Sequence, residues 1–188
     1  MTSLQDILQS KREEDVQRFL ADNKDILLWA FATPSWAGSW CFPKFRFGEK
    51  FVSDFLLLYG HSGRYEVTLI ELEPPTARQF TKSGTFARRL NEAVRQVHDW
   101  FTWIHDHPEY FRSALSEHCS EFRVDSAMTR GGCRVTTSAK IIIGRRAMLT
   151  PTDNARRHTL FAESDRNMEI VPYDRLLEIH NDGVRRDA

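Results

Sequence analysis

Hydrophobic residues in the first thirty positions recur at the spacing of an amphipathic helix. They are Ile7, Leu8, Val16, Phe19, Leu20 and Ile26, with charged residues between them. A period near 3.6 residues places such positions on one face, so residues 4–29 are expected to be helical. Residues 33–39 contain proline, glycine and serine and are expected to form a loop.

Three runs rich in β-branched and aromatic residues follow. Glycine-containing links at 48–50 and 60–63 separate them, and Pro74 and Pro75 end the third run, because proline cannot donate a hydrogen bond to a sheet. Consecutive strands joined by short turns predict a three-stranded meander. The expected strands are Phe45–Phe47, Phe51–Leu58 and Tyr65–Glu73.

The rest of the chain alternates helices with short strands. A long apolar stripe predicts a helix over 85–105, and the uniformly apolar run at 139–144 is typical of a strand buried on both faces. This order predicts one α/β domain. The other expected elements are a helix over 110–122, a loop over 123–138, a helix over 153–163, a strand over 168–171 and a helix over 173–180.

Composition excludes several classes of protein. The 26 Lys and Arg residues balance the 26 Asp and Glu residues, so no global positive charge indicates nucleic-acid binding, although a neutral total is compatible with a local basic face. Cys41, Cys119 and Cys133 form no Cys-x-x-Cys pair, which favours a reduced, intracellular protein without a zinc knuckle. The sequence shows neither a signal-peptide pattern nor a membrane-length apolar run, so a soluble, cytoplasmic protein is expected.

Three carboxylates carry the candidate chemistry. Glu71 and Glu73 lie two positions apart on one expected strand, so their side chains share a face, and Asp54 lies on the neighbouring strand. Carboxylates that converge in this way repel one another unless a cation lies between them, and hard oxygen ligands favour Mg²⁺ or Mn²⁺. Acidic residues on a strand are often simply solvated, but these lie at the ends of apolar core strands, which favours a site.

The sequence resembles the PD-(D/E)XK nuclease superfamily and, more closely, the nuclease domain of Shedu-type anti-phage defence proteins. The matching stretches are residues 14–20, 53–57, 70–74, 93–100, 140–145 and 170–177. The resemblance implies a restriction-endonuclease-like core, a mixed central sheet of a three-stranded meander plus further strands, flanked by helices. Within a single domain, 1–188, it implies an N-terminal helical segment, 1–30, a core with the site, 45–145, and a C-terminal helix-strand-helix, 146–188.

The resemblance also implies an activity. We expect a metal-dependent DNA endonuclease or nickase in which Asp54 and Glu71 bind the metal. The family pattern usually reads Glu-x-Lys, and this chain has Glu73 at the lysine position. Glu73 would then act as general base or as a further ligand, and Arg78 or Lys82 would be alternative sources of the missing cation.

Two other kinds of protein stay open. One is a catalytically degenerate nuclease fold that acts as a nucleic-acid-binding or assembly module. The other is a small-molecule-binding α/β protein whose carboxylates are incidental. Metal binding through Asp54, Glu71 and Glu73 would distinguish the nuclease from the small-molecule binder.

Further residues are candidates for supporting roles. The resemblance implies that Gln96 faces the carboxylates and that Glu14 joins the metal shell; the alternatives are a solvated helix border and an ordinary charged helix start. A group of basic residues is suited to phosphate contacts or to a solvated helix face. These are Arg78, Lys82, Arg88, Arg89 and Arg95.

Assembly follows from the expected reaction. One active site cuts one strand, so two-fold pairing is the simplest way to cut both, and symmetric dimers are the commonest soluble assemblies. We therefore expect a homodimer or a dimer of dimers, with aromatic residues of the 29–42 segment, such as Trp36 and Trp40, contributing. A regulatory partner or domain acting in trans is a further expectation.

Overall fold

The computed structural model describes residues 3–9, 12–32, 38–61, 64–119, 134–164 and 167–186. A five-stranded mixed sheet with the order β1-β2-β3-β4-β5 forms its centre. The strands are β1 (Ser39–Phe47), β2 (Phe51–His61), β3 (Arg64–Leu72), β4 (Arg134–Ile142) and β5 (Met168–Val171). Residues 33–37 and 62–63, where a loop and a turn are expected, lie outside the described residues, as do Trp36 and Cys133.

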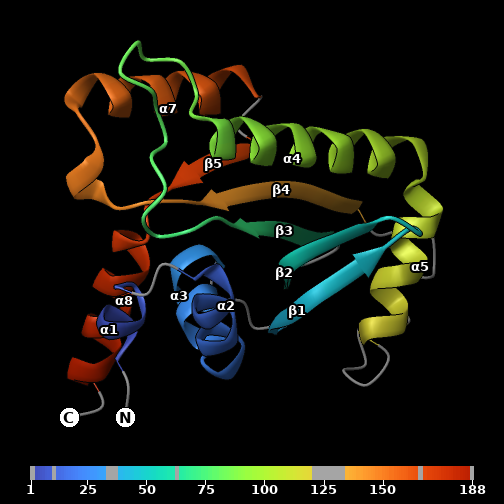
Figure 1. Cartoon of the computed structure of the whole chain (residues 1–188). Helices are drawn as coiled ribbons and strands as arrows, with labels where there is room; N and C mark the ends of the chain where they lie inside the picture. The colour runs from blue at the N-terminus through green and yellow to red at the C-terminus, as the bar shows by residue number, and fades with distance from the viewer. Residues whose placement is uncertain are drawn as a thin grey trace.

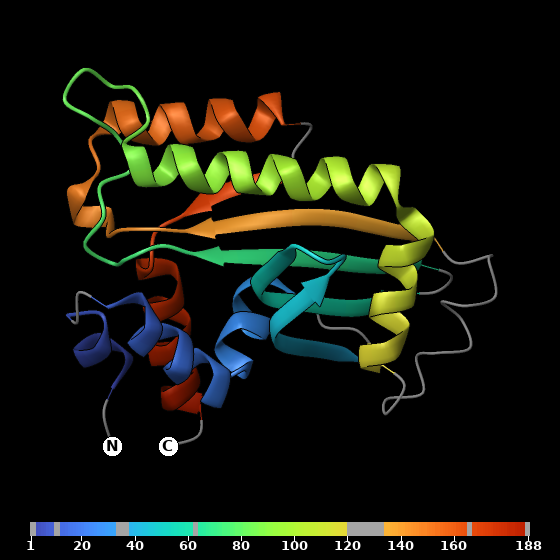
Figure 2. The same ribbon diagram turned by 45° about the vertical axis from the view of Figure 1, so that its right-hand side comes forward.

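Helices cover both faces of the sheet. Figures 1 and 2 show α4 and α7 on one face, and α1, α2, α3 and α8 on the other. The fold is therefore α/β, with a five-stranded mixed sheet flanked by helices, consistent with a restriction-endonuclease-like core. The helices are α1 (Leu4–Ile7), α2 (Glu13–Asp22), α3 (Asp25–Phe31), α4 (Arg88–Asp106), α5 (Pro108–Cys119), the 3₁₀ helix η2 (Arg146–Met148), α7 (Pro151–Glu163) and α8 (Asp174–Arg186).

The directions of the strands place several strand ends at one edge of the sheet. Strands β1, β2 and β3 form the expected antiparallel meander, whereas β4 runs parallel to β3 and β5 parallel to β4. Consequently the carboxyl ends of β3, β4 and β5 meet at the same edge. Strand β2 begins at this edge because it runs opposite to β3. In open α/β sheets, this is the edge at which ligands bind.

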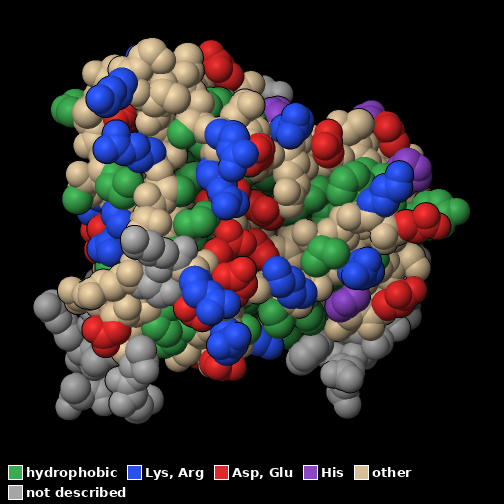
Figure 3. Space-filling view, in the orientation of Figure 1, with side chains coloured by type: hydrophobic (Ala, Val, Ile, Leu, Met, Phe, Trp, Pro, Cys, Tyr) green, Lys and Arg blue, Asp and Glu red, His purple; other side chains and the backbone are tan. Residues whose placement is uncertain are grey.

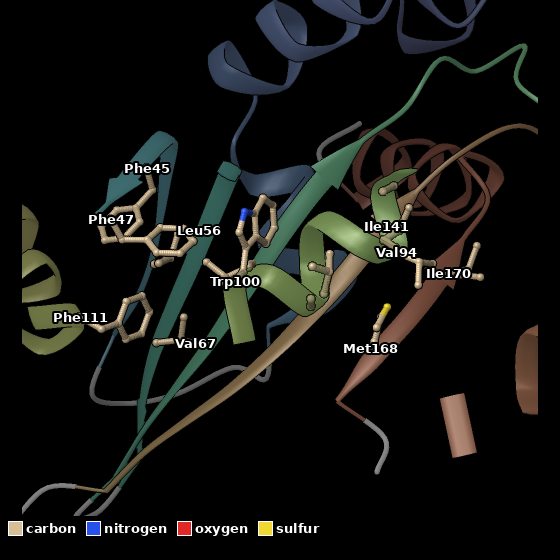
Figure 4. Packing of buried hydrophobic residues seen from close by; sticks show 14 of the residues in the cluster. Phe45, Phe47, Leu56, Val67, Val94, Trp100, Phe111, Ile141, Met168 and Ile170 are labelled. Carbon is tan, nitrogen blue, oxygen red and sulfur yellow. The ribbon is translucent and has the colours of Figure 1, made fainter. Parts of the chain in front are cut away.

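Two hydrophobic cores hold the sheet. The first lies between the sheet and helices α4 and α5, where Trp100 is fully buried and packs edge-on to Phe47, as Figure 4 shows. The second lies between the sheet and helices α1, α2, α3 and α8, and includes Leu20, Leu27 and Leu57. Because both faces are covered, the central strands are almost continuously apolar.

The N-terminal segment differs from the single helical stretch expected over 4–29. It forms the separate helices α1, α2 and α3. Helix α2 ends at Asn23, whose backbone leaves the helical region (φ −127°, ψ 55°) and whose side-chain amide donates to the carbonyl of Phe19. Shorter helices let Leu4, Leu20 and Leu27 all reach the second core.

Strand β4 begins at Arg134, so the loop expected over 123–138 is wrong for residues 134–138. Residues 120–133 lie outside the described part of the chain. The early half of β4 is polar, and hydrogen bonds rather than burial attach it to β3: the hydroxyls of Ser138 and Thr68 lie 3.1 Å apart. A hydrophobic pattern does not reveal such a strand.

Several helix boundaries also differ from expectation: α7 begins at Pro151 rather than at residue 153, and α8 ends at Arg186 rather than at residue 180. Helix α4 begins at Arg88 rather than near residue 85, because Phe86 forms a bridge with Phe80 in the preceding loop. Pro108, expected only to end the long helix, is the first residue of α5, where its missing N–H has no intrahelical partner to lose. None of the helices in the described ranges is both long and apolar enough to cross a membrane.

Candidate active site

The start of β2 and the end of β3 bring the predicted carboxylates together. Phe55 pairs with Ile70, so the next antiparallel position along sets Asp54 opposite Glu71, with both side chains on one side of the sheet. Glu73 follows β3 directly. Asp54 and Glu73 are only 7% and 6% exposed. Figure 3 shows acidic side chains gathered on this face between α4 and α2, bordered by Lys and Arg side chains.

Three elements hold the Asp54 carboxylate. Its Oδ2 accepts a hydrogen bond of 2.8 Å from the backbone N–H of Leu72 in β3. Its Oδ1 accepts one of 2.6 Å from Lys44 Nζ in β1 and one of 3.3 Å from Gln17 Nε2 in α2. The orientation of this carboxylate is therefore fixed by its surroundings.

Lys44 stands in an unusual backbone conformation. It lies between the pairs Pro43–Phe55 and Phe45–Ser53, and thus opposite Asp54, with φ at +49°. Residues other than glycine rarely adopt this region, and they do so most often at functional sites. The strand changes face here: Cys41 belongs to the second core, whereas Phe45, four residues on, belongs to the first.

Glu73 has a fixed backbone and one buried side-chain oxygen without a hydrogen bond. Its carbonyl accepts a 2.8 Å bond from the hydroxyl of the fully buried Tyr173, and its N–H donates to the carbonyl of Ile142. Its Oε2 is buried without a hydrogen bond, and Arg89 Nη1 lies 3.7 Å away. A buried carboxylate oxygen in this state is costly unless something binds it.

Burial and neighbouring carboxylates raise the pKa values of three glutamates in the cluster. Burial, then the charges of Asp54, Glu73 and Glu13, raise the pKa of Glu71 to about 9, against the opposing charge of Lys44. Burial and the charge of Glu13 raise the pKa of Glu73 to about 7. Burial and the charge of Asp54 also raise the pKa of Glu13. The cluster therefore lacks positive charge.

The carboxylate that α2 contributes is Glu13. The Glu14 side chain is 68% exposed and lies 3.9 Å from Arg12, whereas Glu13 is half-buried and acts electrostatically on both Glu71 and Glu73. The expected residue, Glu14, is therefore the outward-facing neighbour of the carboxylate that reaches the cluster. Three more residues of the site carry no signal in the sequence pattern: Gln17, Lys44 and Tyr173.

The other predicted residues lie around the cluster. Gln96 lines a groove of about 440 Å³ between α4 and the start of β2, together with Lys50, Glu92 and Arg95. Of the basic group, Arg89 approaches the carboxylates, and Arg88 lies 3.8 Å from Glu92. The side chains of Arg78, Lys82 and Arg95 are exposed.

The donor chemistry suits a divalent cation, but the site is not preformed. Among the residues described, no group of three or more Asp, Glu, His or Cys is arranged to hold a metal ion. The Lys44 ammonium takes the place beside Asp54 Oδ1 that a cation would compete for. Four hard carboxylates, three of them glutamates with raised pKa values, and one buried oxygen without a hydrogen bond still fit Mg²⁺ or Mn²⁺ better than a softer metal.

Fold and site together define an α/β domain of restriction-endonuclease-like architecture with a carboxylate cluster at one sheet edge. The chain belongs to the family described as Shedu protein SduA, C-terminal, which it matches over residues 10–177. The predicted relationship to Shedu proteins is thereby confirmed, whereas membership of the PD-(D/E)XK superfamily stays a prediction. A comparison with curated proteins gives no match.

Proposed function

We propose that this domain hydrolyses phosphodiester bonds of DNA with Mg²⁺ or Mn²⁺. Its family suggests a role in anti-phage defence. The observation that supports the activity best is the cluster of Glu13, Asp54, Glu71 and Glu73, which share one electrostatic environment and include a buried carboxylate oxygen of Glu73 without a hydrogen bond. Perturbed pKa values at the binding edge of a sheet are typical of catalytic centres.

The residues of the cluster have different roles in this proposal. Asp54, Glu71 and Glu73 would hold the metal, with Glu13 beside them. When bound, the metal supplies positive charge for the scissile phosphate and lowers the pKa of a bound water. Because the pKa of Glu73 is about 7, its carboxylate is suited to accept the proton of the attacking water at neutral pH.

Two cations of the chain would face the substrate. Lys44 and Arg89 each approach a site carboxylate while their side chains are 56% and 52% exposed. A cation that is both anchored and exposed can stabilise charge that develops on phosphate oxygens. In this proposal the exposed residues Arg78, Lys82, Arg88 and Arg95 would bind flanking phosphates.

One observation favours the degenerate alternative. The 2.6 Å ion pair of Lys44 and Asp54 resembles a structural bridge that has replaced a metal. In that case the fold would bind nucleic acid, or assemble, without cleaving it. Metal binding distinguishes the two proposals, because Mn²⁺ should not bind at Asp54 if the ion pair with Lys44 has replaced the metal.

Substitution of Asp54 tests the proposal directly. With Mg²⁺ or Mn²⁺ the wild-type protein should nick supercoiled plasmid, and Asp54→Ala should lose about a thousandfold or more of that rate, as loss of a metal ligand requires. Asp22→Ala, which removes an exposed carboxylate at the end of α2, is the matched control. Nicking by Asp54→Ala at the wild-type rate would refute the proposal.

Glu73 can be tested in both directions. Glu73→Gln is nearly isosteric and should keep the fold but lose metal-dependent cleavage, because it can neither bind the metal as an anion nor accept a proton. Glu73→Lys restores the commoner family pattern, and should gain activity only if the natural protein is degenerate. Plasmid nicking and thermal melting measure both effects; unchanged cleavage in both variants would make Glu73 a bystander.

A further inference from the structure

A second polar cavity lies beyond the carboxylate cluster. It has a volume of about 310 Å³ and is lined by residues of α3, β4, η2, α7, β5 and the first turn of α8. Figure 1 shows α7 above β5, and α8 below the sheet on the same side of the molecule. The cavity shares no lining residue with the carboxylate cluster. Its charged lining consists of Lys140, Arg146, Arg157, Arg175 and Glu169.

Carboxylates pair with only part of this positive charge. Lys140 Nζ lies 2.6 Å from Glu169 Oε2 within the cavity, and Arg146 binds Glu178 outside it. In the part of the chain that the structure describes, Arg157 and Arg175 form no ion pair. With four cations against Glu169, the lining carries a net charge of about +3.

Arg157 is held in place entirely by neutral acceptors. Its Nε and Nη2 donate to the carbonyl of Ile170 at 3.0 and 2.6 Å, and its Nη1 donates to Asn154 Oδ1 at 3.0 Å. These bonds fix the guanidinium against the exposed edge of β5 and use three of its five N–H groups. Burial, together with the nearby charge of Arg146, lowers the pKa of Arg157, against the opposing charge of Glu169. Because the Glu169 carboxylate already pairs with Lys140, it compensates the charge of the half-buried Arg157 only in part.

We propose that this cavity binds a phosphate dianion, carried either by inorganic phosphate or by a mononucleotide. Guanidinium groups match phosphate oxygens with paired, charge-assisted hydrogen bonds. Arg157 supplies a fixed donor and Arg175 an exposed one that can close on the ligand. The volume is in the range of small-ligand sites. This site is independent of the proposed nuclease activity, because it uses none of the same residues.

Calorimetric titration of the full chain with sodium phosphate and with dAMP, at constant ionic strength, tests the proposal. Saturable binding of one equivalent is expected. Arg175→Gln should weaken it about tenfold, the effect of one charge-assisted hydrogen bond. Arg46→Gln, which removes an exposed cation from the opposite edge strand β1, should change the affinity less than about twofold.

Further variants separate the site from its neighbours. Arg157→Lys keeps the positive charge but loses the planar guanidinium with its paired donors, and should also weaken binding. Thermal melting shows whether this variant still folds, because Arg157 also bonds the backbone of β5. Asp54→Ala should leave phosphate binding unchanged, so the titration tests the phosphate site independently of the proposed nuclease activity. Equal affinity for both ligands identifies inorganic phosphate, and tighter binding of dAMP identifies a mononucleotide. Absence of saturable binding, or equal losses in Arg175→Gln and Arg46→Gln, would overturn the proposal.

Discussion

Replacement of Glu71 by Gln is expected to abolish metal-dependent cleavage and, at the same time, to stabilise the metal-free protein at alkaline pH. Glu71 lies in the cluster where burial and the charges of Asp54 and Glu73 raise its pKa to about 9. The substitution removes an ionisable group that the metal-free fold tolerates poorly. It also removes an anionic ligand that the proposed metal needs.

The direction in which stability changes with pH follows from the pKa values of Glu71 in the folded and unfolded states. In the unfolded chain the pKa of Glu71 is near its ordinary value of 4.5, whereas in the folded protein it is about 9. Between these values the folded state binds a proton that the unfolded state lacks, so stability falls as pH rises. Each bound proton contributes a slope of at most about 1.4 kcal/mol per pH unit. Glu73, with a pKa of about 7, adds to this slope only in the lower part of the window.

Thermal melts from pH 5 to pH 9 in the presence of a chelator measure the effect. Wild-type protein should lose stability throughout this range, and Glu71→Gln should show a shallower loss above pH 7. Glu66→Gln, on the same strand but ion-paired with Arg64, is the matched control and should follow the wild type. Added Mn²⁺ should raise the melting temperature of the wild type more than that of Glu71→Gln. A variant that keeps the wild-type slope would contradict the raised pKa.

The part of the site that could be predicted from the sequence is the part that strand geometry determines. Alternation at the end of β3 puts Glu71 and Glu73 on one face, and only two residues separate β2 from β3, which leaves few registers for Asp54. In the structure the three carboxylates act electrostatically on one another. The strands that carry them are strongly apolar, which makes the alternation easy to recognise in the sequence.

The remaining site residues depend on tertiary packing. Glu13 and Glu14 differ by one helical step of about 100°, and only the docking of α2 decides which carboxylate faces the cluster. Tyr173 comes from a segment one hundred residues away from Glu73. Its hydroxyl reaches the Glu73 carbonyl because β4 and β5 place the start of α8 beside the end of β3. Periodicity carries no information on such contacts.

Lys44 is a site residue that the pattern of hydrophobic residues does not predict. The expected first strand began at Phe45, so Lys44 lay outside it, and no local pattern of hydrophobic residues predicts a left-handed lysine at the centre of a strand. The sequence therefore indicates only Arg78 and Lys82, after β3, as sources of the cation missing from the Glu-x-Lys pattern. In the described residues, the cations in contact with site carboxylates are Lys44 and Arg89.

Replacement of Lys44 by Gln should lower the cleavage rate about a hundredfold to a thousandfold, the loss expected when a charge that stabilises the transition state is removed. Binding of Mn²⁺ should persist or tighten, because Asp54 Oδ1 loses the ammonium that occupies it. Opposite effects on cleavage and metal binding would separate a catalytic cation from a structural one. Lys50→Gln, in the turn of the same hairpin and exposed, is the control.

A glycine at position 44 tests the charge of Lys44 separately from the backbone conformation of that residue. Glycine adopts positive φ without strain, so Lys44→Gly should keep the folded hairpin while it removes the ammonium. Loss of cleavage with a preserved melting transition would assign the function to the charge. Lys44 normally opposes the rise in the pKa of Glu71, so both variants should shift that pKa higher. If Lys44→Gln and Lys44→Gly cleave DNA at the wild-type rate, Lys44 serves only to hold Asp54, and the charge that faces the phosphate must come from Arg89.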